Sequence, residues 1–283
     1  MALYWTVSGP VDVHYGREWS QFDWSDRCAE AAKTGFRGIG LWHADVEHQL
    51  QTRTLREMRA IFDDAGLQYL EVEFLADFFV DPGKPARAES DRLRGQLFET
   101  AAAFDAHHIK VGNIPGTPCE LGRLTEEFAA LCYDAAQHTN AKIAYELMPF
   151  DVTVNTLETA VELVVGAGAR NGGLAIDTWH MGKLGISPGD LQRIPLEQLV
   201  WVELSDGQQE SMEDPVDETI NHRRLPGEGE FDISGYVQAL QDLGYPGPWG
   251  VEVLSAELRS LPIEEEFRRA YETTLAQFRA GVA

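Results

Sequence analysis

Short apolar runs of strand-like character alternate with longer helix-like segments along almost the whole chain. The short runs have the length of buried strands, and the longer segments carry apolar residues at the three- and four-residue spacing of helices. Strands that alternate with helices in this way predict a parallel sheet joined by crossover helices. The expected strands span residues 3–7, 36–41, 68–74, 108–111, 142–147, 174–177, 200–204 and 250–253.

An expected helix follows each of these strands. Glycine stands after several of them, as at Gly35, Gly66 and Gly244, where the left-handed backbone of a helix terminus costs glycine little. Eight strand–helix pairs favour an α/β fold of the closed (β/α)8 TIM barrel type over an open sheet. No linker or change in composition divides the chain, so we expect a single TIM-barrel domain over residues 1–283. The expected helices span residues 24–34, 50–65, 88–104, 125–138, 156–167, 188–194, 233–243 and 263–278.

Four carboxylates occupy matching positions in four consecutive expected strands. A carboxylate in an apolar strand is costly to bury unless it is paired or bound to a cation. Around a parallel barrel such acids converge on one mouth, where a hard divalent ion such as Mg²⁺ or Mn²⁺ relieves their repulsion. The alternative for each acid alone is a helix cap or an ion pair. As a set they predict a metal site formed by Glu146, Asp177, Glu203 and Glu252.

Small residues precede three of these acids by two positions, at Ala144, Ala175 and Gly250. Side chains alternate between the two faces of a strand, so each small residue points the same way as its acid. We expect these small residues, in the layer beneath the acids, to leave room for a metal–substrate complex above them. Trp201 breaks this pattern two positions before Glu203.

Several further side chains near expected strand ends could contact a substrate. His180, three residues after Asp177, is a candidate metal ligand or substrate donor, with a satisfied surface histidine as the alternative. An arginine in the long loop after residue 204 could hold a substrate oxygen, or belong to a solvated basic patch. Aromatic residues at a barrel mouth stack on rings or simply pack. The candidate arginines are Arg223 and Arg224 in that loop. The first half of the barrel offers Trp42 and His43, with Trp5, His14 and Glu73 near other expected strand ends.

Charge and composition narrow the class of protein. The formal net charge of −23 opposes binding to a nucleic acid backbone, which requires Lys and Arg. No apolar run reaches the roughly 18–20 residues of a membrane span, and the first residues carry no basic signal segment. We therefore expect a cytoplasmic protein with a small-molecule ligand. Cys28, Cys119 and Cys132 fit buried free thiols better than a disulfide framework or a zinc finger.

Four segments carry a resemblance to a known family: YELMP around Glu146, DTWH from Asp177 to His180, RLPGEGEFD from Arg224, and GVEVL around Glu252. In this order and spacing the chain resembles the xylose isomerase-like sugar phosphate isomerase/epimerase family. These TIM barrels include inosose dehydratases, hydroxypyruvate isomerases, ketose 3-epimerases and 3-dehydroshikimate dehydratases. The resemblance covers essentially the whole barrel.

The resemblance implies roles for particular residues. It implies that Glu146, Asp177 and Glu252 bind the metal, and that His180 and one of Arg223 and Arg224 hold substrate oxygens. In the epimerases the glutamates that match Glu146 and Glu252 also move protons at the reacting carbon.

Two positions depart from the family pattern. The family's fourth ligand is usually a histidine on the seventh strand, where this chain has Glu203. Glu203 could complete an all-oxygen site, His222 could replace it, or the metal could be weakly bound or absent. Gly40 stands where many members carry a glutamate.

Together these features favour a divalent-metal-dependent isomerase or epimerase of a small sugar, keto-sugar or cyclitol, acting through an enediolate. One ion is expected, with Mn, Mg or Co preferred to Zn or Fe. The alternatives are a metal-dependent dehydratase on a similar substrate and a non-catalytic barrel that supports a partner enzyme. A nuclease on a related barrel would need a histidine-rich zinc site and a basic face, which this chain lacks. A homodimer or a partner subunit remains open.

Overall fold

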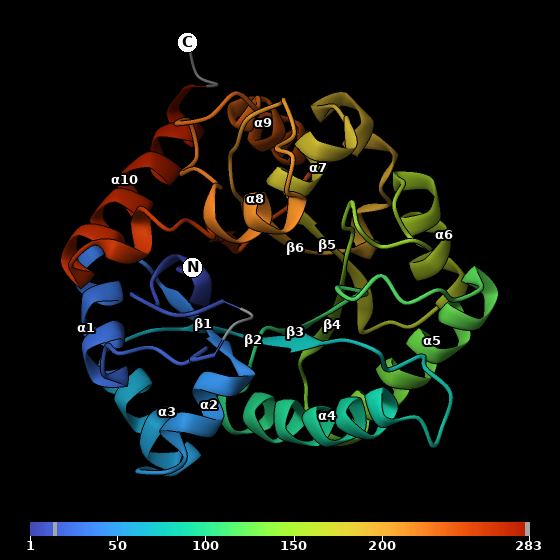
Figure 1. Cartoon of the computed structure of the whole chain (residues 1–283), viewed down its shortest axis with the longest axis horizontal. Helices are drawn as coiled ribbons and strands as arrows, with labels where there is room; N and C mark the ends of the chain where they lie inside the picture. The colour runs from blue at the N-terminus through green and yellow to red at the C-terminus, as the bar shows by residue number, and fades with distance from the viewer. Residues whose placement is uncertain (14–15, 281–283) are drawn as a thin grey trace.

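The computed structural model describes residues 1–13 and 16–280 and confirms the expected α/β TIM barrel (Figure 1). Within these residues seven parallel strands form one sheet in chain order, and all but the first of the eight expected strands are present. The expected site residue His14 lies outside the described residues. The strands are β1 (Gly38–Trp42), β2 (Tyr69–Leu75), β3 (His108–Val111), β4 (Lys142–Glu146), β5 (Gly172–Asp177), β6 (Leu199–Leu204) and β7 (Trp249–Val251).

The expected first strand, residues 3–7, is wrong as a strand. Ala2 forms single parallel bridges to Ile39 of β1 and to Val251 of β7, and the chain then turns into the 3₁₀ helix η1 (Tyr4–Thr6). The N-terminal residues therefore lie between the first and last strands and bridge the two edges of the sheet.

Thr6 supplies the physical reason for the short pairing. Its hydroxyl donates to the carbonyl of Val251 and accepts from the backbone N–H of Val253, at 2.8 Å in both cases. A threonine hydroxyl competes in this way with a backbone ladder. The side chain therefore takes over the pairing with the end of β7 that a longer strand would have made.

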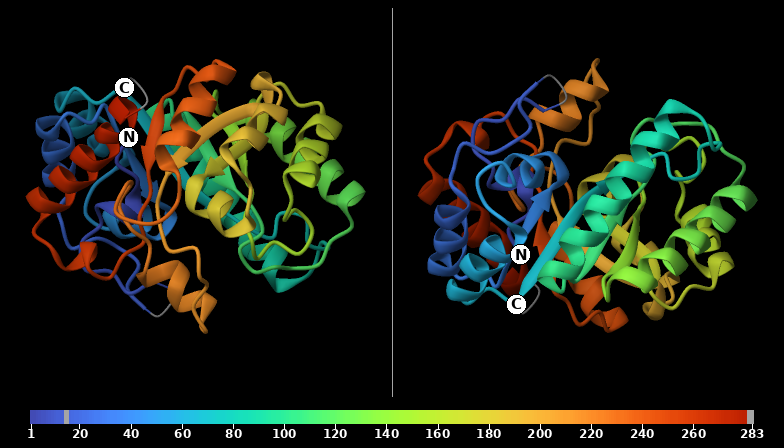
Figure 2. Two further views of the ribbon diagram at one scale, coloured as in Figure 1. Left: turned by 90° about the horizontal axis from the view of Figure 1, so that it is seen from above. Right: turned by 90° about the horizontal axis from the view of Figure 1, so that it is seen from below.

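Most helices form an outer ring around the sheet, whereas α8 lies inside that ring in Figure 1, and α4 runs along the outer side of β2 (Figures 1 and 2). No helix among the described residues is long and apolar enough to cross a membrane. The helices are α1 (Trp24–Thr34), α2 (His43–Gln49), α3 (Leu55–Asp64), α4 (Pro85–Phe104), α5 (Leu121–His138), α6 (Leu157–Ala167), α7 (Thr178–Leu184), α8 (Pro215–Asn221), α9 (Ile233–Leu243) and α10 (Ile263–Ala280), with 3₁₀ turns η2 (Pro188–Arg193), η3 (Leu196–Gln198) and η4 (Leu258–Ser260).

Several helices differ from the expectation. The helix expected over residues 50–65 begins later, at Leu55, because a capping box between Thr54 and Glu57 starts α3, and the preceding helix α2 (His43–Gln49) was not expected. The two short helices α7 and α8 were not expected. Asp177 caps α7, and Asp214 caps α8 ahead of a proline in its first turn, so both helices begin with recognisable start signals.

The interior of the barrel beneath the acids is filled by Trp201. A Cβ on Gly250 would lie 2.5 Å from Cζ2 of this indole, and Ala144 and Ala175 pack in the same buried cluster. The expectation that these small residues leave room for a metal–substrate complex is therefore corrected. They accommodate Trp201, which is the residue that broke the sequence pattern.

Candidate active site

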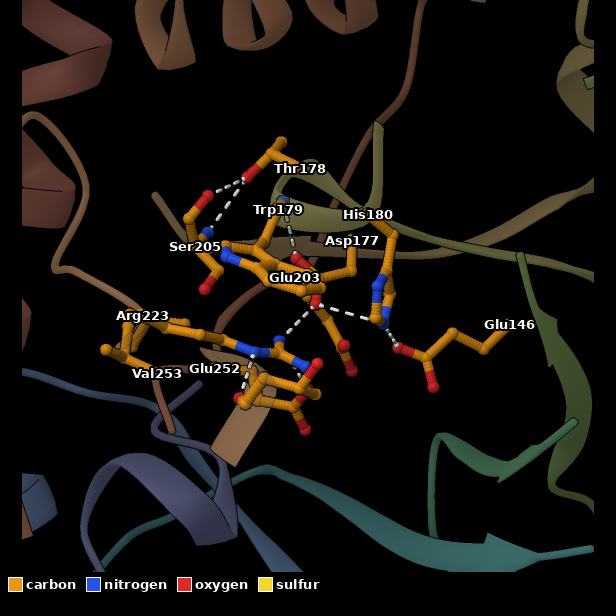
Figure 3. A network of polar contacts seen from close by, with 12 residues as sticks. Glu146, Asp177, Thr178, Trp179, His180, Glu203, Ser205, Arg223, Glu252 and Val253 are labelled. Carbon is orange, nitrogen blue, oxygen red and sulfur yellow. Dashed lines mark hydrogen bonds and ion pairs between the residues drawn. The ribbon is translucent and has the colours of Figure 1, made fainter. Parts of the chain in front are cut away.

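The four expected acids meet at the carboxyl ends of their strands. Glu146 ends β4, Asp177 ends β5 opposite Glu203 of β6, and Glu252 follows β7 directly. One carboxylate oxygen from each lies within 4.8 Å of the others, and none of the four residues is more than 4% exposed. Their convergence agrees with the spacing argument made from the strands. Figure 3 shows the four around one point.

Lys110 of β3 reaches into this cluster and was missed by the sequence reasoning. Its Nζ lies 2.9 and 3.1 Å from the two carboxylate oxygens of Glu203, 2.6 Å from Glu252 Oε1 and 2.9 Å from Glu73 Oε2. The residue is 1% exposed. A lone lysine in the apolar run HIKV was the available signal, because a buried ammonium group needs anionic partners.

Arg223 reaches the other side of the cluster from the long loop after β6. Its NH1 group lies 2.7 Å from Asp177 Oδ2 and 3.6 Å from Glu252 Oε2, and its guanidinium group stacks 4.6 Å from the ring centre of Trp179 (Figure 3). Arg224 is not brought to the cluster. Its side chain is exposed, and its backbone N–H and C=O pair with those of Asp206. Of the two expected arginines, only Arg223 faces the acids.

Asp206 holds the loop that carries Arg223. Its carboxylate accepts hydrogen bonds from four backbone N–H groups, at 2.7 to 3.1 Å. A Cβ on Gly229 would lie 2.3 Å from Asp206 Oδ1, so only glycine allows the loop to close this tightly. The PGEGEFD segment thus has a structural basis in this aspartate. The four donors are the N–H groups of Gly207, Gly227, Gly229 and Phe231.

His180, in the first turns of α7, faces the acids. Its Nε2 lies 3.2 Å from Glu146 Oε1 and 3.6 Å from Asp177 Oδ2. Its Nδ1 is buried and has no hydrogen-bond partner among the described residues. Asp177 also accepts a bond from the Trp179 N–H at 2.9 Å, so it serves both as a helix cap and as a member of the cluster.

The pKa values of the acids reflect their burial and the charges around them. Burial would raise the pKa of Glu146, but Lys110 and the hydrogen bond from His180 lower it to about 2. Burial and the neighbouring Glu252 raise the pKa of Glu203 well above its ordinary value. Burial also raises the pKa of Glu252, although Lys110 opposes the shift. Burial therefore favours the protonated forms of Glu203 and Glu252, and a cation between the acids would favour their ionised forms.

A cavity of about 60 Å³ lies over the acids. Lys110, Glu73, Glu146, His180 and Glu252 contribute polar groups to it, and Arg223 and Thr219 border it. Apolar side chains form most of the remaining wall, which gives the cavity one polar and one apolar side. These side chains are Trp5, Val13, Trp42, Phe74, Ile114, Met148, Phe150, Ile220 and Leu254.

The remaining sequence candidates take other places. Trp42 lines the cavity against Trp5, with ring centres 4.8 Å apart, while its indole N–H donates to Glu18. His43 is half-buried behind Trp42 and is not among the residues that line the cavity. His222 is exposed, with Nε2 3.0 Å from Asp217, and does not join the acids.

The three cysteines are free. Cys28 and Cys132 are buried, as expected, and burial raises the pKa of each thiol to about 12. Cys119 is only partly buried, which corrects the expectation of three buried thiols.

Comparison with known proteins gives a consistent result. A protein-family model described as a xylose isomerase-like TIM barrel matches residues 28–276. The chain is 27% identical over 239 residues to a 3-dehydroshikimate dehydratase of Pseudomonas aeruginosa, covering 82% of this chain and 36% of that protein. It is 28% identical over 250 residues to an inosose isomerase of Halalkalibacterium halodurans, covering 86% of this chain and 87% of that protein.

Solved structures share the fold. A crystal structure of the IOLI protein with a binding zinc atom superposes with a TM-score of 0.81 at 18% identity, covering 98% of this chain and 97% of that one. The chain spans about a third of the length of the dehydratase relatives, and nearly the whole length of the isomerase. The curated relatives are named as enzymes of two kinds, isomerases and dehydratases.

Proposed function

The chain belongs to the xylose isomerase-like TIM barrel family, and from this premise we propose that it is a divalent-metal-dependent isomerase or epimerase. The proposed substrate is a small sugar, keto-sugar or cyclitol whose proton moves through an enediolate. One observation carries the proposal: four buried carboxylates have oxygens within 4.8 Å of one another, and two of them, Glu146 and Glu252, line a cavity. The isomerase relative supports this class of reaction.

The donor set fits a divalent ion. Four carboxylate oxygens suit a hard cation, whose charge would offset the burial and the mutual repulsion that raise the pKa values of Glu203 and Glu252. Glu146, Asp177, Glu203 and Glu252 would hold the ion, which supplies Lewis acidity towards a carbonyl when bound. All-oxygen ligands favour Mn²⁺, Mg²⁺ or Co²⁺, whereas zinc was found in the related IOLI structure.

Glu146 and Glu252 are the proposed proton carriers. They come from β4 and from the end of β7, with β5 and β6 between them in the sheet, and both border the cavity. A substrate carbon between them could lose a proton to one carboxylate and regain it from the other. Arg223 offers its guanidinium group to a substrate oxygen, and His180 keeps Glu146 oriented through its Nε2 contact.

The cavity defines how a substrate would lie. Its oxygens would face the acids, and its C–H surface would face Trp5, Trp42 and their apolar neighbours. Ligand sites usually measure roughly 300–1,000 Å³, so a cavity of about 60 Å³ must widen before a six-carbon substrate enters. We therefore expect a compact substrate and movement of the covering segments on binding.

A dehydratase is the second candidate, favoured by the 27% identity to a 3-dehydroshikimate dehydratase over 82% of this chain. Both reactions begin with removal of a proton beside a carbonyl. In a dehydratase the resulting enediolate expels a β-hydroxyl group, which must receive a proton as it leaves. The same carboxylates could serve either outcome.

Proton exchange tests the proposal without a known product. Keto-cyclitols and 2-keto sugars are incubated with the Mn²⁺-loaded protein in D₂O, and NMR follows deuterium at the carbon beside the carbonyl. Glu146→Gln and Glu252→Gln should each slow exchange about 10²-fold or more, because a general base typically contributes that much. Glu162→Gln, an exposed glutamate on α6, serves as the control.

The outcome distinguishes an isomerase or epimerase from a dehydratase. Exchange without loss of water supports an isomerase or epimerase, and loss of a hydroxyl group supports the dehydratase. If both variants exchange deuterium as fast as the unmodified protein, the assignment of these glutamates is wrong.

A further inference from the structure

Lys110 occupies an unusual place for a lysine. It points into the barrel from β3 and is fully enclosed, although its ammonium group is normally strongly hydrated. Three carboxylates replace the lost water: Glu73, Glu203 and Glu252 each lie within 2.9 Å of Nζ. An ammonium group has three N–H donors, so its hydrogen-bonding capacity is filled. This complete set of partners indicates that the fold provides a specific binding position for the ammonium group.

Two of these partners are also proposed metal ligands. Glu203 turns both of its oxygens to Lys110 and accepts a third hydrogen bond from the Trp201 indole at 2.7 Å. Glu252 shares its carboxylate between Lys110 and Arg223. Lys110 and a metal ion would therefore draw on the same oxygens.

The charges of the site leave a negative excess for a divalent ion. When ionised, the four ligand carboxylates and Glu73 carry five negative charges, and Lys110 and Arg223 contribute two positive charges against them. Three negative charges are left, and one divalent ion reduces this excess to one. Without Lys110 the excess before the ion binds would be four.

We propose that Lys110 is a built-in counter-cation of the metal site, sharing Glu203 and Glu252 with the ion and thereby limiting both the affinity and the charge of the ion that binds. This inference rests on the metal dependence proposed above. Lys110 is a positioning residue here, because it acts through the two glutamates.

Removing the charge should tighten metal binding. An ammonium group that shares carboxylates with a divalent ion repels it, and at the few ångströms involved we expect Lys110→Met to lower the Kd for Mn²⁺ about tenfold or more. The repulsion scales with the charge of the ion. Lys110→Met should therefore change the logarithm of the Kd about one and a half times as much for Tb³⁺ as for Ca²⁺, which has a similar radius.

Isothermal titration calorimetry of the metal-free protein with each ion measures these affinities. Lys110→Arg keeps the positive charge and should retain the affinity of the unmodified protein more closely than Lys110→Met does. Lys142→Met removes an exposed lysine at the start of β4 and should change the Kd less than twofold, because solvent screens its charge.

The outcomes separate the two proposals. If the unmodified protein binds no divalent ion, the metal dependence itself is wrong. If it binds Mn²⁺ and Lys110→Met binds with equal or weaker affinity, the metal dependence stands and the role of Lys110 is overturned. A purely structural role would weaken all ions alike and would show no dependence on ionic charge.

A second measurement covers the case in which Lys110→Met fails to fold. Lys110→Gln retains a donor for Glu203 and is expected to show the same ion-charge dependence. In the unmodified protein the Nζ resonance of Lys110, assigned by its slow proton exchange, should shift on titration with Mg²⁺. An unchanged resonance at saturating Mg²⁺ would overturn the proposal without any variant.

Discussion

Replacing Asp206 with alanine should release the loop that carries Arg223 towards the acids. Asp206 is buried, and its carboxylate accepts four backbone N–H groups from residues 207–231. A hydrogen bond to a charged group contributes about 1.5–3 kcal/mol, but water can re-solvate the exposed part of this loop. We therefore expect a loss of about 3 kcal/mol in the free energy of unfolding, well below the sum of the four bonds.

Denaturant unfolding and hydrogen exchange measure this effect without any substrate. Asp206→Ala should lower the unfolding midpoint and raise amide exchange at Gly227, Gly229 and Phe231. Gly229→Ala perturbs the same contact from the other side, since its Cβ would lie 2.3 Å from Asp206 Oδ1. Gly122→Ala, where a Cβ meets nothing within 4 Å, is the control. A loss below about 0.5 kcal/mol with unchanged exchange would refute the role of Asp206.

Two further variants test the barrel interior and a buried acid. Gly250→Ala places a Cβ 2.5 Å from Trp201. We therefore expect denaturant unfolding to show a loss of about 1–3 kcal/mol in the free energy of unfolding, together with a shifted contact between the indole and Glu203. Unchanged stability would show that this layer has spare room. Burial raises the pKa of Glu266 to about 9, so the folded state keeps a proton that the unfolded chain loses above about pH 4.5, and stability falls as pH rises towards 9. Glu266→Gln should reduce the slope of the free energy of unfolding against pH by about 1.4 kcal/mol per pH unit between about pH 5 and 9. The control Glu265→Gln, at the neighbouring glutamate, should leave this slope unchanged. Equal slopes in the unmodified protein and both variants would contradict the burial argument.

Most of the fold could be predicted from the repeated alternation of strands and helices. The four acids could be placed together from sequence because parallel strands deliver their carboxyl ends to one mouth, and a period of two fixes which side chains point inward. The first strand could not be predicted correctly, since the apolar run over residues 3–7 does not reveal that the Thr6 hydroxyl binds β7 instead.

Contacts across the barrel were harder to foresee. Lys110 and Trp201 lie 91 positions apart and come from β3 and β6, yet both contact Glu203. Nothing near Lys110 in the sequence indicates three acidic partners 37 or more residues away. The two arginines after residue 222 were equally plausible from sequence. The backbone pairing of Arg224 with Asp206 determines that Arg223 is the one that faces Asp177.

Anomalous diffraction from a crystal soaked in Mn²⁺ tests the proposed metal centre most directly. One peak bounded by carboxylate oxygens of Glu146, Asp177, Glu203 and Glu252, and absent from a Glu146→Gln/Glu252→Gln crystal, is the expected result. No peak between these residues at saturating Mn²⁺, or a peak that persists in the double variant, would contradict a metal-dependent active site at this mouth of the barrel.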